Sequence, residues 1–217
     1  GSIIRLSIAV TPADPNYVYL LASKNDYSFG GVYRSISSGA AGTWSVMSTT
    51  PNIFDWSTNG SGSGGQGWYD IAIGVSPTNP NEIVCGGVNT WRSTNGGASW
   101  TLFTHWYGGG GKPYVYADLH DVQYTSSNTI YLATDGGLFR TTNGGTSFSA
   151  INGQMNIAQI YKLGLSALTS SLMVTGLQDN GTLKWNGTIW QGIYGGDGAD
   201  CFISWNNNST IVASYVY

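Results

Sequence analysis

The chain has 217 residues, of which 32 are Gly, 14 Tyr and 9 Trp, and only 9% are charged. A net charge of -3 with eight Lys plus Arg removes the electrostatic basis for binding nucleic acid or an anionic membrane surface. We therefore expect no nucleic-acid partner. No apolar run approaches the ~18 residues of a membrane span, so we expect no membrane insertion either. Aromatic and β-branched residues, with Gly, Asn and Ser between short apolar runs, favour an all-β fold.

Five segments share one pattern, which is an apolar run, a turn rich in Pro, Asn or Ser, and a second apolar run. They are residues 7–23, 71–87, 121–137, 163–181 and 202–217. This pattern predicts β-hairpins. The first three hairpins continue into a third strand and a fourth strand that begins near an aromatic residue, and the fourth hairpin does so in shortened form. The sequence therefore predicts four antiparallel strands per repeat.

The repeat recurs about every fifty residues, which is typical of β-propeller blades. We expect one all-β propeller domain or fragment over residues 1–217, with blades at about 1–50, 65–105, 115–152 and 158–194 and a partial blade at 198–217. Either strands from the N-terminus complete the last blade, or the chain is part of a larger, six- to eight-bladed propeller. We favour the larger propeller because residues 1–50 already form a complete unit.

Two stretches, RSTNGGASW and RTTNGGTSF, are nearly the same. Their shared positions are Ser93, Asn95, Gly97, Ser99 and Trp100 in one, and Thr141, Asn143, Gly145, Ser147 and Phe148 in the other. In such a turn Asn bonds nearby backbone, Gly supplies a positive φ and the aromatic ring packs between blades. We expect these turns to join the third and fourth strands, opposite the face that binds ligand, and to be structural.

The two stretches fit the pattern SxDxGxTW with Asn in place of Asp, and so resemble the Asp-box or BNR-repeat propellers. That group includes sialidases, glycoside hydrolase family 74 xyloglucanases, sortilin-type receptors and a photosystem assembly factor. Sialidases clamp the substrate carboxylate with three arginines. Here Arg34, Arg92 and Arg140 precede the repeated turns as scaffold residues, which leaves only Arg5. We therefore do not expect a sialidase.

The predicted register places all acidic residues except Asp14 and Glu82 on the opposite face, together with both histidines. Exposed aromatic rings beside carboxylates are typical of sugar binding, because flat rings cover the apolar face of a pyranose. The alternative is that the rings pack the loops down. The candidate ligand-binding residues are His120, Asn180, Trp68, Trp106, Tyr107 and Tyr194.

The segment ATDGGLFR resembles the TDxGGxYR segment that carries a catalytic Asp in the family 74 xyloglucanases, which makes Asp135 the first catalytic candidate. In that family the motif lies in the first blade and the partner Asp lies in a second propeller domain. Glycosidases need two carboxyl groups, and the candidates for the second are Asp118, Asp179 and Asp197. A set of Asp residues also suits Ca²⁺, so the metal, if any, stays open.

A wider resemblance runs along most of the chain, through GWYDIAI, SPTNPNEIVCGGVN, YADLHDVQY, GLQDNGT and GGDGAD. These segments are similar to large secreted bacterial BNR-repeat proteins, which often carry a type IX secretion sorting domain and are described as glycosyl hydrolases or adhesins. The resemblance implies a secreted or cell-surface propeller that binds, and in one reading hydrolyses, a polysaccharide or cell-surface glycan. The alternative is a non-catalytic adhesin or protein-interaction module, and in both readings other domains or chains complete the propeller.

Overall fold

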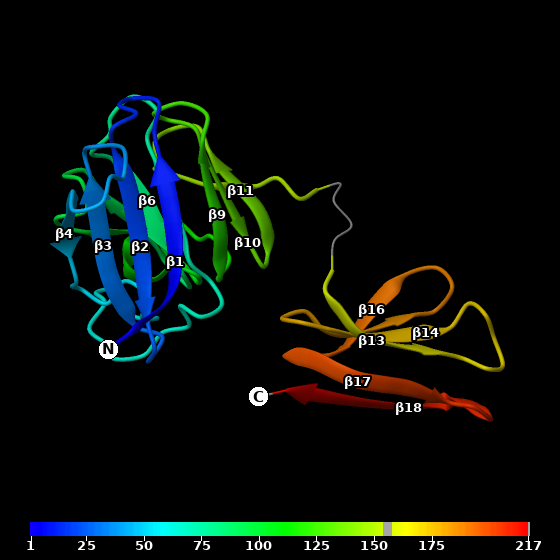
Figure 1. Ribbon diagram of the computed structural model, residues 1–217. Helices are drawn as coiled ribbons and strands as arrows, with labels where there is room; N and C mark the ends of the chain where they lie inside the picture. Colours follow the sequence, from blue (N-terminus) through cyan, green and yellow to red (C-terminus); the bar gives the residue numbers. More distant parts are fainter. Residues whose placement is uncertain (154–157, 217) are drawn as a thin grey trace. The chain divides into compact units, whose positions relative to one another are not determined.

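The computed structural model describes residues 1–153 and 158–216 and is built almost entirely of antiparallel strands (Figure 1). It divides into two compact units, Gly1–Gln154 and Met155–Tyr217. Within the described ranges, one short 3-10 helix, η1 (Gly109–Gly111), is the only helical element, and no helix could span a membrane. Tyr217, the last residue of the predicted partial blade, lies outside the described residues.

The N-terminal unit contains three four-stranded sheets, and each sheet follows chain order from its first to its fourth strand. The first sheet comprises β1 (Ile3–Val10), β2 (Val18–Lys24), β3 (Phe29–Ser35) and β4 (Trp44–Ser48). The second comprises β5 (Ala72–Val75), β6 (Ile83–Gly86), β7 (Thr90–Ser93) and β8 (Thr101–Thr104). The third comprises β9 (Leu119–Tyr124), β10 (Ile130–Thr134), β11 (Gly137–Thr141) and β12 (Ser149–Ala150).

Short polar side chains set the turn between the first two strands of a sheet. The Asp14 carboxylate accepts a hydrogen bond from the Asn16 backbone at 2.9 Å, and the Asn79 side chain accepts one from the Asn81 backbone at 3.0 Å. Such bonds give the backbone a local partner outside the sheet and favour chain reversal. The predicted hairpins therefore have a local physical cause.

The cores of the N-terminal unit lie between consecutive sheets. One buried cluster joins Tyr19, Leu21 and Val32 of the first sheet to Ile73 and Trp91 of the second. Another joins Val84 and Phe103 of the second sheet to Val122, Ile130 and Leu132 of the third. A four-stranded sheet that is apolar on both faces must be covered on both sides, and this requirement stacks the sheets face to face.

Gly74 shows how closely the sheets approach. A methyl group at Gly74 would lie 2.6 Å from Val122 Cγ1 and 2.8 Å from the Val122 carbonyl oxygen. Real Cβ atoms do not come this close to backbone, so β5 and β9 can pack at this distance only because residue 74 has no side chain.

Strands β1 and β5 occupy equivalent places in their sheets but differ in exposure. Ile8 and Val10 of β1 are 65% and 64% exposed, whereas the corresponding Ile73 and Val75 of β5 are 6% and 7% exposed. The β5 residues are covered by the first sheet. Within the described N-terminal unit, no sheet covers the equivalent row on β1, so this unit ends on an apolar face.

The C-terminal unit contains one four-stranded sheet and one two-stranded sheet. The first comprises β13 (Ile160–Leu165), β14 (Met173–Leu177), β15 (Gly181–Trp185) and β16 (Trp190–Tyr194), and the second comprises β17 (Asp197–Ser204) and β18 (Asn207–Val216). Leu172, Val174, Cys201 and Ile203 form the core between them. Gly164 repeats the role of Gly74, since its Cβ would lie 2.9 Å from Phe202 Cα. The prediction that residues 1–217 form a single propeller domain stays a prediction.

Candidate functional site

The candidate site of the N-terminal unit is built from three connections between strands. They are the β4–β5 connection, the β8–β9 connection and the tight β10–β11 turn. These segments and the start of β9, which carries His120, bring together Gln66, Tyr69, Asp70, Asp118, His120 and Asp135, which we call the acid site. The predicted residues Asp135, Asp118 and His120 thus lie together.

Asp135 is held by donors on both of its carboxylate oxygens. Oδ1 lies 2.6 Å from His120 Nε2, and Oδ2 accepts a hydrogen bond from the Tyr69 hydroxyl at 2.7 Å. The Asp135 side chain is only 13% exposed. These contacts fix the orientation of the carboxylate, as a group that acts on a bound substrate requires.

Asp118 lies beside Asp135. One carboxylate oxygen of each residue lies within 4.8 Å of the other. Asp118 has a φ of 67°, which is unfavourable for a residue other than Gly, and its carbonyl accepts the Asp135 backbone N–H at 3.3 Å. Strained backbone of this kind costs about 1–3 kcal/mol and concentrates at functional sites. Burial raises the pKa of Asp118, and the negative charge of Asp135 adds to the effect.

Asp70 is the buried carboxyl group of the acid site. Its side chain is fully buried, and Oδ2 accepts a hydrogen bond from Gln66 Nε2 at 3.2 Å. The same Gln66 nitrogen donates to Asp118 Oδ1, which brings the carboxyl groups of Asp70 and Asp118 close to each other. Burial, with a further contribution from the Asp118 charge, raises the pKa of Asp70 to about 8. Asp70 Oδ1 is buried with no hydrogen-bond partner among the described residues.

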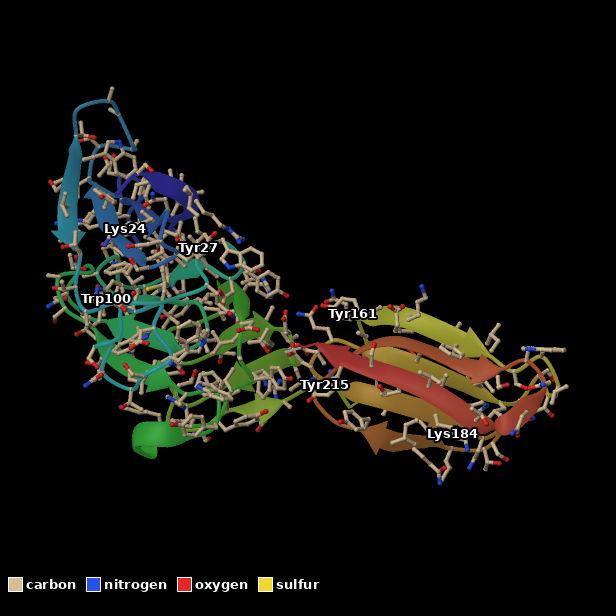
Figure 2. All side chains as sticks on the ribbon, turned by 90° about the horizontal axis from the view of Figure 1, so that it is seen from below. Lys24, Tyr27, Trp100, Tyr161, Lys184 and Tyr215 are labelled. Atoms are coloured by element: carbon tan, nitrogen blue, oxygen red, sulfur yellow. The ribbon has the colours of Figure 1, made fainter. Side chains whose placement is uncertain are left out.

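A row of aromatic rings leads across the surface to the acid site. Tyr27 and Trp68 are 46% and 57% exposed and lie edge to face, with ring centroids 6.4 Å apart. Trp68 lies 5.4 Å from Tyr69, which lies 5.1 Å from His120. We call Tyr27, Trp68, Tyr69 and His120 the aromatic row; Tyr27 is labelled in Figure 2. The rings are inclined to one another by 42° to 83°, and the row ends beside the Asp135 carboxylate that His120 and Tyr69 contact.

Arg5 holds this row in place. Its guanidinium donates hydrogen bonds to the backbone carbonyls of Trp68, at 2.7 Å, and Tyr69. The Gly67 backbone N–H donates to the Tyr27 carbonyl at 3.1 Å, and Tyr27 has a φ of 68°. Arg5 therefore supports the loop and does not present a free cation to a ligand.

The predicted residues Trp106 and Tyr107 form a second aromatic cluster with His105. Tyr107 packs against the buried His105 ring at 4.2 Å, and its backbone N–H donates to His105 Nδ1 at 3.3 Å. Burial lowers the pKa of His105. Asn89 ties this loop to its neighbour, because it donates to the Trp56 carbonyl and accepts the Trp106 N–H, both at 3.2 Å.

The remaining site candidates lie in the C-terminal unit. Asp179 has a φ of 56°, and its backbone N–H donates to Asp197 Oδ1 at 2.7 Å. The Asn180 amide donates to the Gln178 carbonyl at 3.0 Å. Tyr194 packs against Tyr215, labelled in Figure 2, with centroids 5.2 Å apart. Asp179 and Asp197 are thus neighbours in this unit.

The two NGG turns, residues 93–100 and 141–148, repeat one hydrogen-bond pattern. Ser93 Oγ accepts the backbone N–H groups of Asn95 and Gly97 at 3.3 and 2.8 Å, and Asn95 Oδ1 accepts the Ser99 N–H at 3.0 Å. Thr141 and Asn143 make the same bonds with Gly145 and Ser147. The aromatic residues of both turns pack toward a neighbouring sheet. Trp100 Nε1 donates to Ser48 Oγ at 2.8 Å, and the ring centroids of Phe148 and Phe103 lie 5.6 Å apart.

The first sheet has a variant of this turn. Ser35 Oγ accepts the backbone N–H of Gly39 at 3.1 Å, just as Ser93 accepts that of Gly97. Gly39 thus takes the place of the turn glycine in this sheet. An inserted segment separates it from Thr43, whose hydroxyl lies 2.6 Å from Ser35 Oγ.

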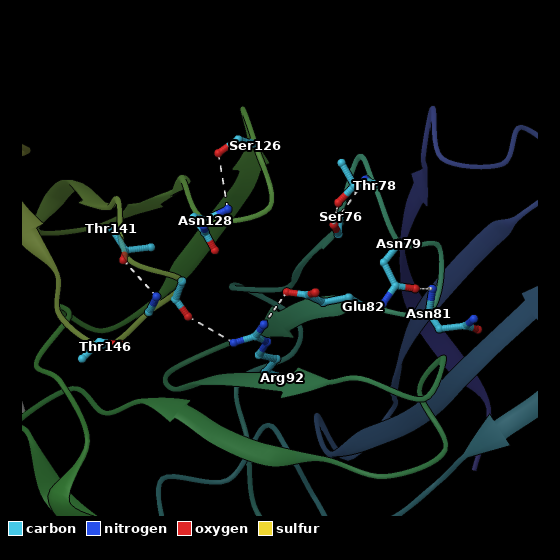
Figure 3. Close-up of polar contacts among 12 residues, drawn as sticks. Ser76, Thr78, Asn79, Asn81, Glu82, Arg92, Ser126, Asn128, Thr141 and Thr146 are labelled. Atoms are coloured by element: carbon cyan, nitrogen blue, oxygen red, sulfur yellow. Dashed lines mark hydrogen bonds and ion pairs between the residues drawn. The ribbon is translucent and has the colours of Figure 1, made fainter.

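The arginines that precede these turns connect one sheet to the next. Arg92 lies 2.6 Å from Glu82 and donates to the Gly144 carbonyl at 3.1 Å, as Figure 3 shows. Arg34 donates to the Asn81 side chain at 3.2 Å. These guanidinium groups therefore bind protein partners.

Sequence reasoning missed four residues that build the site, namely Gln66, Tyr69, Asp70 and Tyr27. Three of them flank Trp68 in the stretch QGWYD, from which only Trp68 was a predicted site residue. An amide, an aromatic hydroxyl and a carboxyl group next to an expected sugar-binding Trp are a signal that could have found them. Tyr27 carries no such signal, because its contact with Trp68 joins two separate loops.

No family model matches the chain, and no curated protein matches it. Among solved structures, the GH74 enzyme from Niastella koreensis shares 22% identity at a TM-score of 0.52, over 96% of this chain and 33% of that one. The GH74 xyloglucanase from Xanthomonas campestris shares 18% identity at a TM-score of 0.48, over 95% of this chain and 34% of that one. YCF48 from Cyanidioschyzon merolae shares 17% identity at a TM-score of 0.45, over 86% of this chain and 55% of that one.

The chain spans about a third of the length of the two GH74 proteins. At this identity the likeness to the Niastella enzyme concerns the fold alone. Together with the four-stranded antiparallel sheets, it confirms the predicted all-β fold of propeller-type blades.

Proposed function

We propose that the chain is part of a propeller that binds a neutral polysaccharide on the aromatic row and hydrolyses it with Asp118 and Asp135. The observation that carries this proposal is the pair of carboxyl groups within 4.8 Å of each other, one of them fixed by Tyr69 and His120. The same His120 and Tyr69 end the aromatic row. The GH74 names of similar folds agree with this activity.

The spacing of the two carboxyl groups favours retention of configuration. Retaining glycosidases place them about 5–5.5 Å apart, and inverting enzymes about 6.5–9.5 Å apart to admit a water molecule. Asp118 would donate its proton to the leaving oxygen as the glycosidic bond breaks, while Asp135 forms a bond to the anomeric carbon. Water would then hydrolyse this ester and return a proton to Asp118.

A neutral ligand fits the surface better than an anionic one. Arg5 and Arg92 are engaged with backbone carbonyls, and Arg34 with an amide side chain. The exposed rings of Tyr27 and Trp68 can cover the apolar faces of sugar rings, while the carboxyl groups accept from hydroxyls. A polymer of neutral sugars is therefore the proposed substrate class. We do not propose a sialidase activity.

The test is a panel of soluble polysaccharides that includes xyloglucan, mixed-linkage glucan and mannan. We expect the wild-type chain to be retarded by at least one polymer in affinity electrophoresis and to release reducing ends. Asp135→Asn should abolish release, and the control Asp121→Asn should not, because Asp121 is exposed and binds its own neighbour Gln123. Neither retardation nor release on any polymer would contradict the proposal. Retardation without release would favour the non-catalytic adhesin or interaction module.

We also propose that further blades, from other domains or another chain, cover the apolar row of β1 in a secreted or cell-surface bacterial protein. The support is the contrast between the exposed Ile8 and the buried Ile73 at equivalent places. Sedimentation analysis should show self-association of the isolated chain that Ile8→Ser reduces. A chain that is monomeric at high concentration with and without this substitution would count against such an interface.

A further inference from the structure

The β4–β5 connection contains a loop, residues 55–62, in which side-chain oxygens face one another. Asp55 Oδ2 accepts hydrogen bonds from the Gly62 backbone N–H, at 2.7 Å, and from the Ser57 hydroxyl. Ser57 Oγ also lies 3.0 Å from Asn59 Oδ1. We call Asp55 Oδ2, Ser57 Oγ and Asn59 Oδ1 the oxygen cluster. It lies in the N-terminal unit, outside the acid site.

The oxygen cluster contains too few hydrogens for its contacts. The Ser57 hydroxyl carries a single hydrogen, which can serve Asp55 or Asn59 but not both. Rotating the Asn59 amide does not help, because the Ser61 backbone N–H lies 3.1 Å from Asn59 Oδ1 and needs an oxygen there. One contact therefore places two oxygen lone pairs against each other without a proton between them. A cation among the three oxygens removes this repulsion.

The charge of Asp55 also calls for a cation. Asp55 is only 5% exposed, and within residues 1–153 and 158–216 no Lys, Arg or His forms an ion pair with it. Burial acts to raise the pKa of Asp55, but the hydrogen bonds from Ser57 and Gly62 outweigh it, so the pKa is lowered and the carboxylate is ionised. Buried charges in proteins are paired or coordinate metals.

The spacing of these residues matches the start of a calcium-binding loop. Loops of the EF-hand type take side-chain oxygens from their first, third and fifth positions and need Gly at the sixth for a sharp turn. Asp55, Ser57 and Asn59 occupy the first three places, and Gly60, with a φ of 66°, occupies the last. Oxygens bound about 2.3–2.6 Å from Ca²⁺ lie roughly 3 Å from one another, which is the separation of Ser57 Oγ and Asn59 Oδ1.

Two departures from this pattern indicate a weak site. The third position holds Ser57, where Asp or Asn is usual. The twelfth position, where EF-hand loops carry a bidentate Glu, holds Gln66, whose amide nitrogen donates to Asp70 and Asp118 instead. With one carboxylate in the loop, we expect a dissociation constant of about 10⁻³ M, at the weak end of calcium sites and typical of extracellular modules.

We propose that Asp55, Ser57 and Asn59 bind Ca²⁺ at a structural site separate from the acid site. Backbone carbonyls and water complete the oxygen ligands that this hard cation takes. The cation neutralises the Asp55 carboxylate and fixes the loop. The same connection continues to Gln66 and Trp68, so calcium stabilises the segment that forms one side of the acid site. The inference does not depend on the proposed hydrolysis.

The first experiment is thermal unfolding of the full chain, freed of metal with EDTA and dialysed, with and without CaCl₂ at about ten times the expected dissociation constant. We expect the melting temperature of wild type to rise by about 3 °C. Asp55→Asn, which keeps an oxygen for the Gly62 N–H but lacks the charge, should lose this rise. Asn59→Ala should reduce it, and since Asn59 is exposed, this variant decides the matter should Asp55→Asn not fold.

The control variant is Asp135→Asn, which removes a carboxylate from the acid site and should keep the full calcium response. A second experiment places the cation. Tb³⁺, a luminescent substitute for Ca²⁺, should emit when the protein is excited through Trp, because Trp56 follows Asp55 directly in the loop. CaCl₂ should displace this emission, and Trp56→Phe should lower it.

Three results would overturn the inference. One is a folded wild type whose melting temperature is unchanged by CaCl₂. Another is a calcium response that folded Asp55→Asn and Asn59→Ala retain in full, or that Asp135→Asn loses, because the cation would then lie at another site. The third is Tb³⁺ emission that Trp56→Phe leaves unchanged. If calcium binds as expected but no polysaccharide is bound or cleaved, the inference holds and the proposed function fails.

Discussion

The NGG turns and the acid site use similar small polar residues in opposite ways. In the NGG turn at 93–100, Ser93 and Asn95 each accept backbone N–H groups at ordinary distances, and Asn95 also bonds Ser99. In the acid site, Asp118 has a positive φ and Asp70 has a buried oxygen without a partner among the described residues. The NGG turn satisfies the hydrogen bonds of its Ser and Asn side chains, whereas the acid site keeps an unpaired carboxyl oxygen and a strained backbone.

This difference separates structure from function more reliably than repetition does. The repeated turns are conspicuous in the sequence, but the Ser93 and Thr141 hydroxyl oxygens accept backbone N–H groups of the turns that link two strands. Unsatisfied buried groups and strained residues cost free energy and persist where they are used. This contrast supports the proposal that the acid site takes part in ligand chemistry and that the NGG turns serve folding.

The largest expected effect is on catalysis, and it tests the acid-site half of the comparison with the NGG turns. Replacing Asp118→Asn removes the proton donor, and we expect hydrolysis to fall by about 10²–10⁴-fold. Stability should be unchanged or higher, because the repulsion between Asp118 and its acidic neighbours disappears. Rates of reducing-end release and urea unfolding curves check both statements. A variant that hydrolyses at the wild-type rate would remove Asp118 from the mechanism.

The next effect is on stability and concerns the NGG turns. Gly145 has a φ of 92°, and a Cβ there would lie 2.1 Å from the Phe103 ring, whereas at Gly97 the nearest atom, Val32 Cγ1, is 3.0 Å away. We expect Gly145→Ala to cost about 3 kcal/mol through strain and overpacking. Gly97→Ala, with similar backbone strain but a looser contact, should cost about half as much. Equal losses in urea unfolding would mean that the Phe103 contact relaxes freely.

A third effect concerns pH and the buried acid. Because the folded pKa of Asp70 is raised to about 8, the folded state binds more protons than the unfolded state between about pH 4 and pH 8. The stabilising contribution is complete below about pH 4 and is lost as pH rises toward 8. We therefore expect the unfolding free energy to fall as the pH rises through this window. In Asp70→Asn the fall should be smaller, and a wild-type stability that rises from pH 5 to pH 8 would contradict the account.

The smallest expected effect is on binding at the aromatic row. Trp68→Ala removes a ring that is 57% exposed, so we expect a loss of about 1 kcal/mol in polysaccharide binding, or roughly fivefold in the dissociation constant. Trp205 is exposed in the β17–β18 turn, and Trp205→Ala is the matched control. Affinity electrophoresis that shows equal losses for the two variants would remove the aromatic row from the proposed binding surface.

Much of the fold could be predicted from sequence because its causes are local. Asp14 and Asn79 set hairpin turns through bonds two residues away, and the alternation of apolar residues marks each strand. The predicted register placed Asp118, His120 and Asp135 on one face, but it did not predict which acidic residues there are neighbours. The turn of the first sheet could not be predicted in the same way, because an insertion between Gly39 and Thr43 hides the spacing.

The partners inside the site could not be predicted, because they depend on long-range packing. Tyr69 and Asp135 are 66 residues apart in sequence, and Gln66 and Asp118 are 52 apart. Neither pair follows from strand register, since Gln66 and Tyr69 lie in a long connection whose path is set by Arg5 and by backbone bonds. The burial of Asp70 is likewise a property of the packed sheets.

The most direct test of the account is one paired measurement on Asp135→Asn and Ser93→Ala, with polysaccharide hydrolysis and urea unfolding recorded for each. We predict that Asp135→Asn loses hydrolysis and keeps its unfolding free energy. Ser93→Ala should lose about 1–2 kcal/mol of stability through its unsatisfied turn N–H groups and hydrolyse at the wild-type rate while folded. The opposite result, with hydrolysis intact in Asp135→Asn and lost in folded Ser93→Ala, would contradict the division between the acid site and the NGG turns.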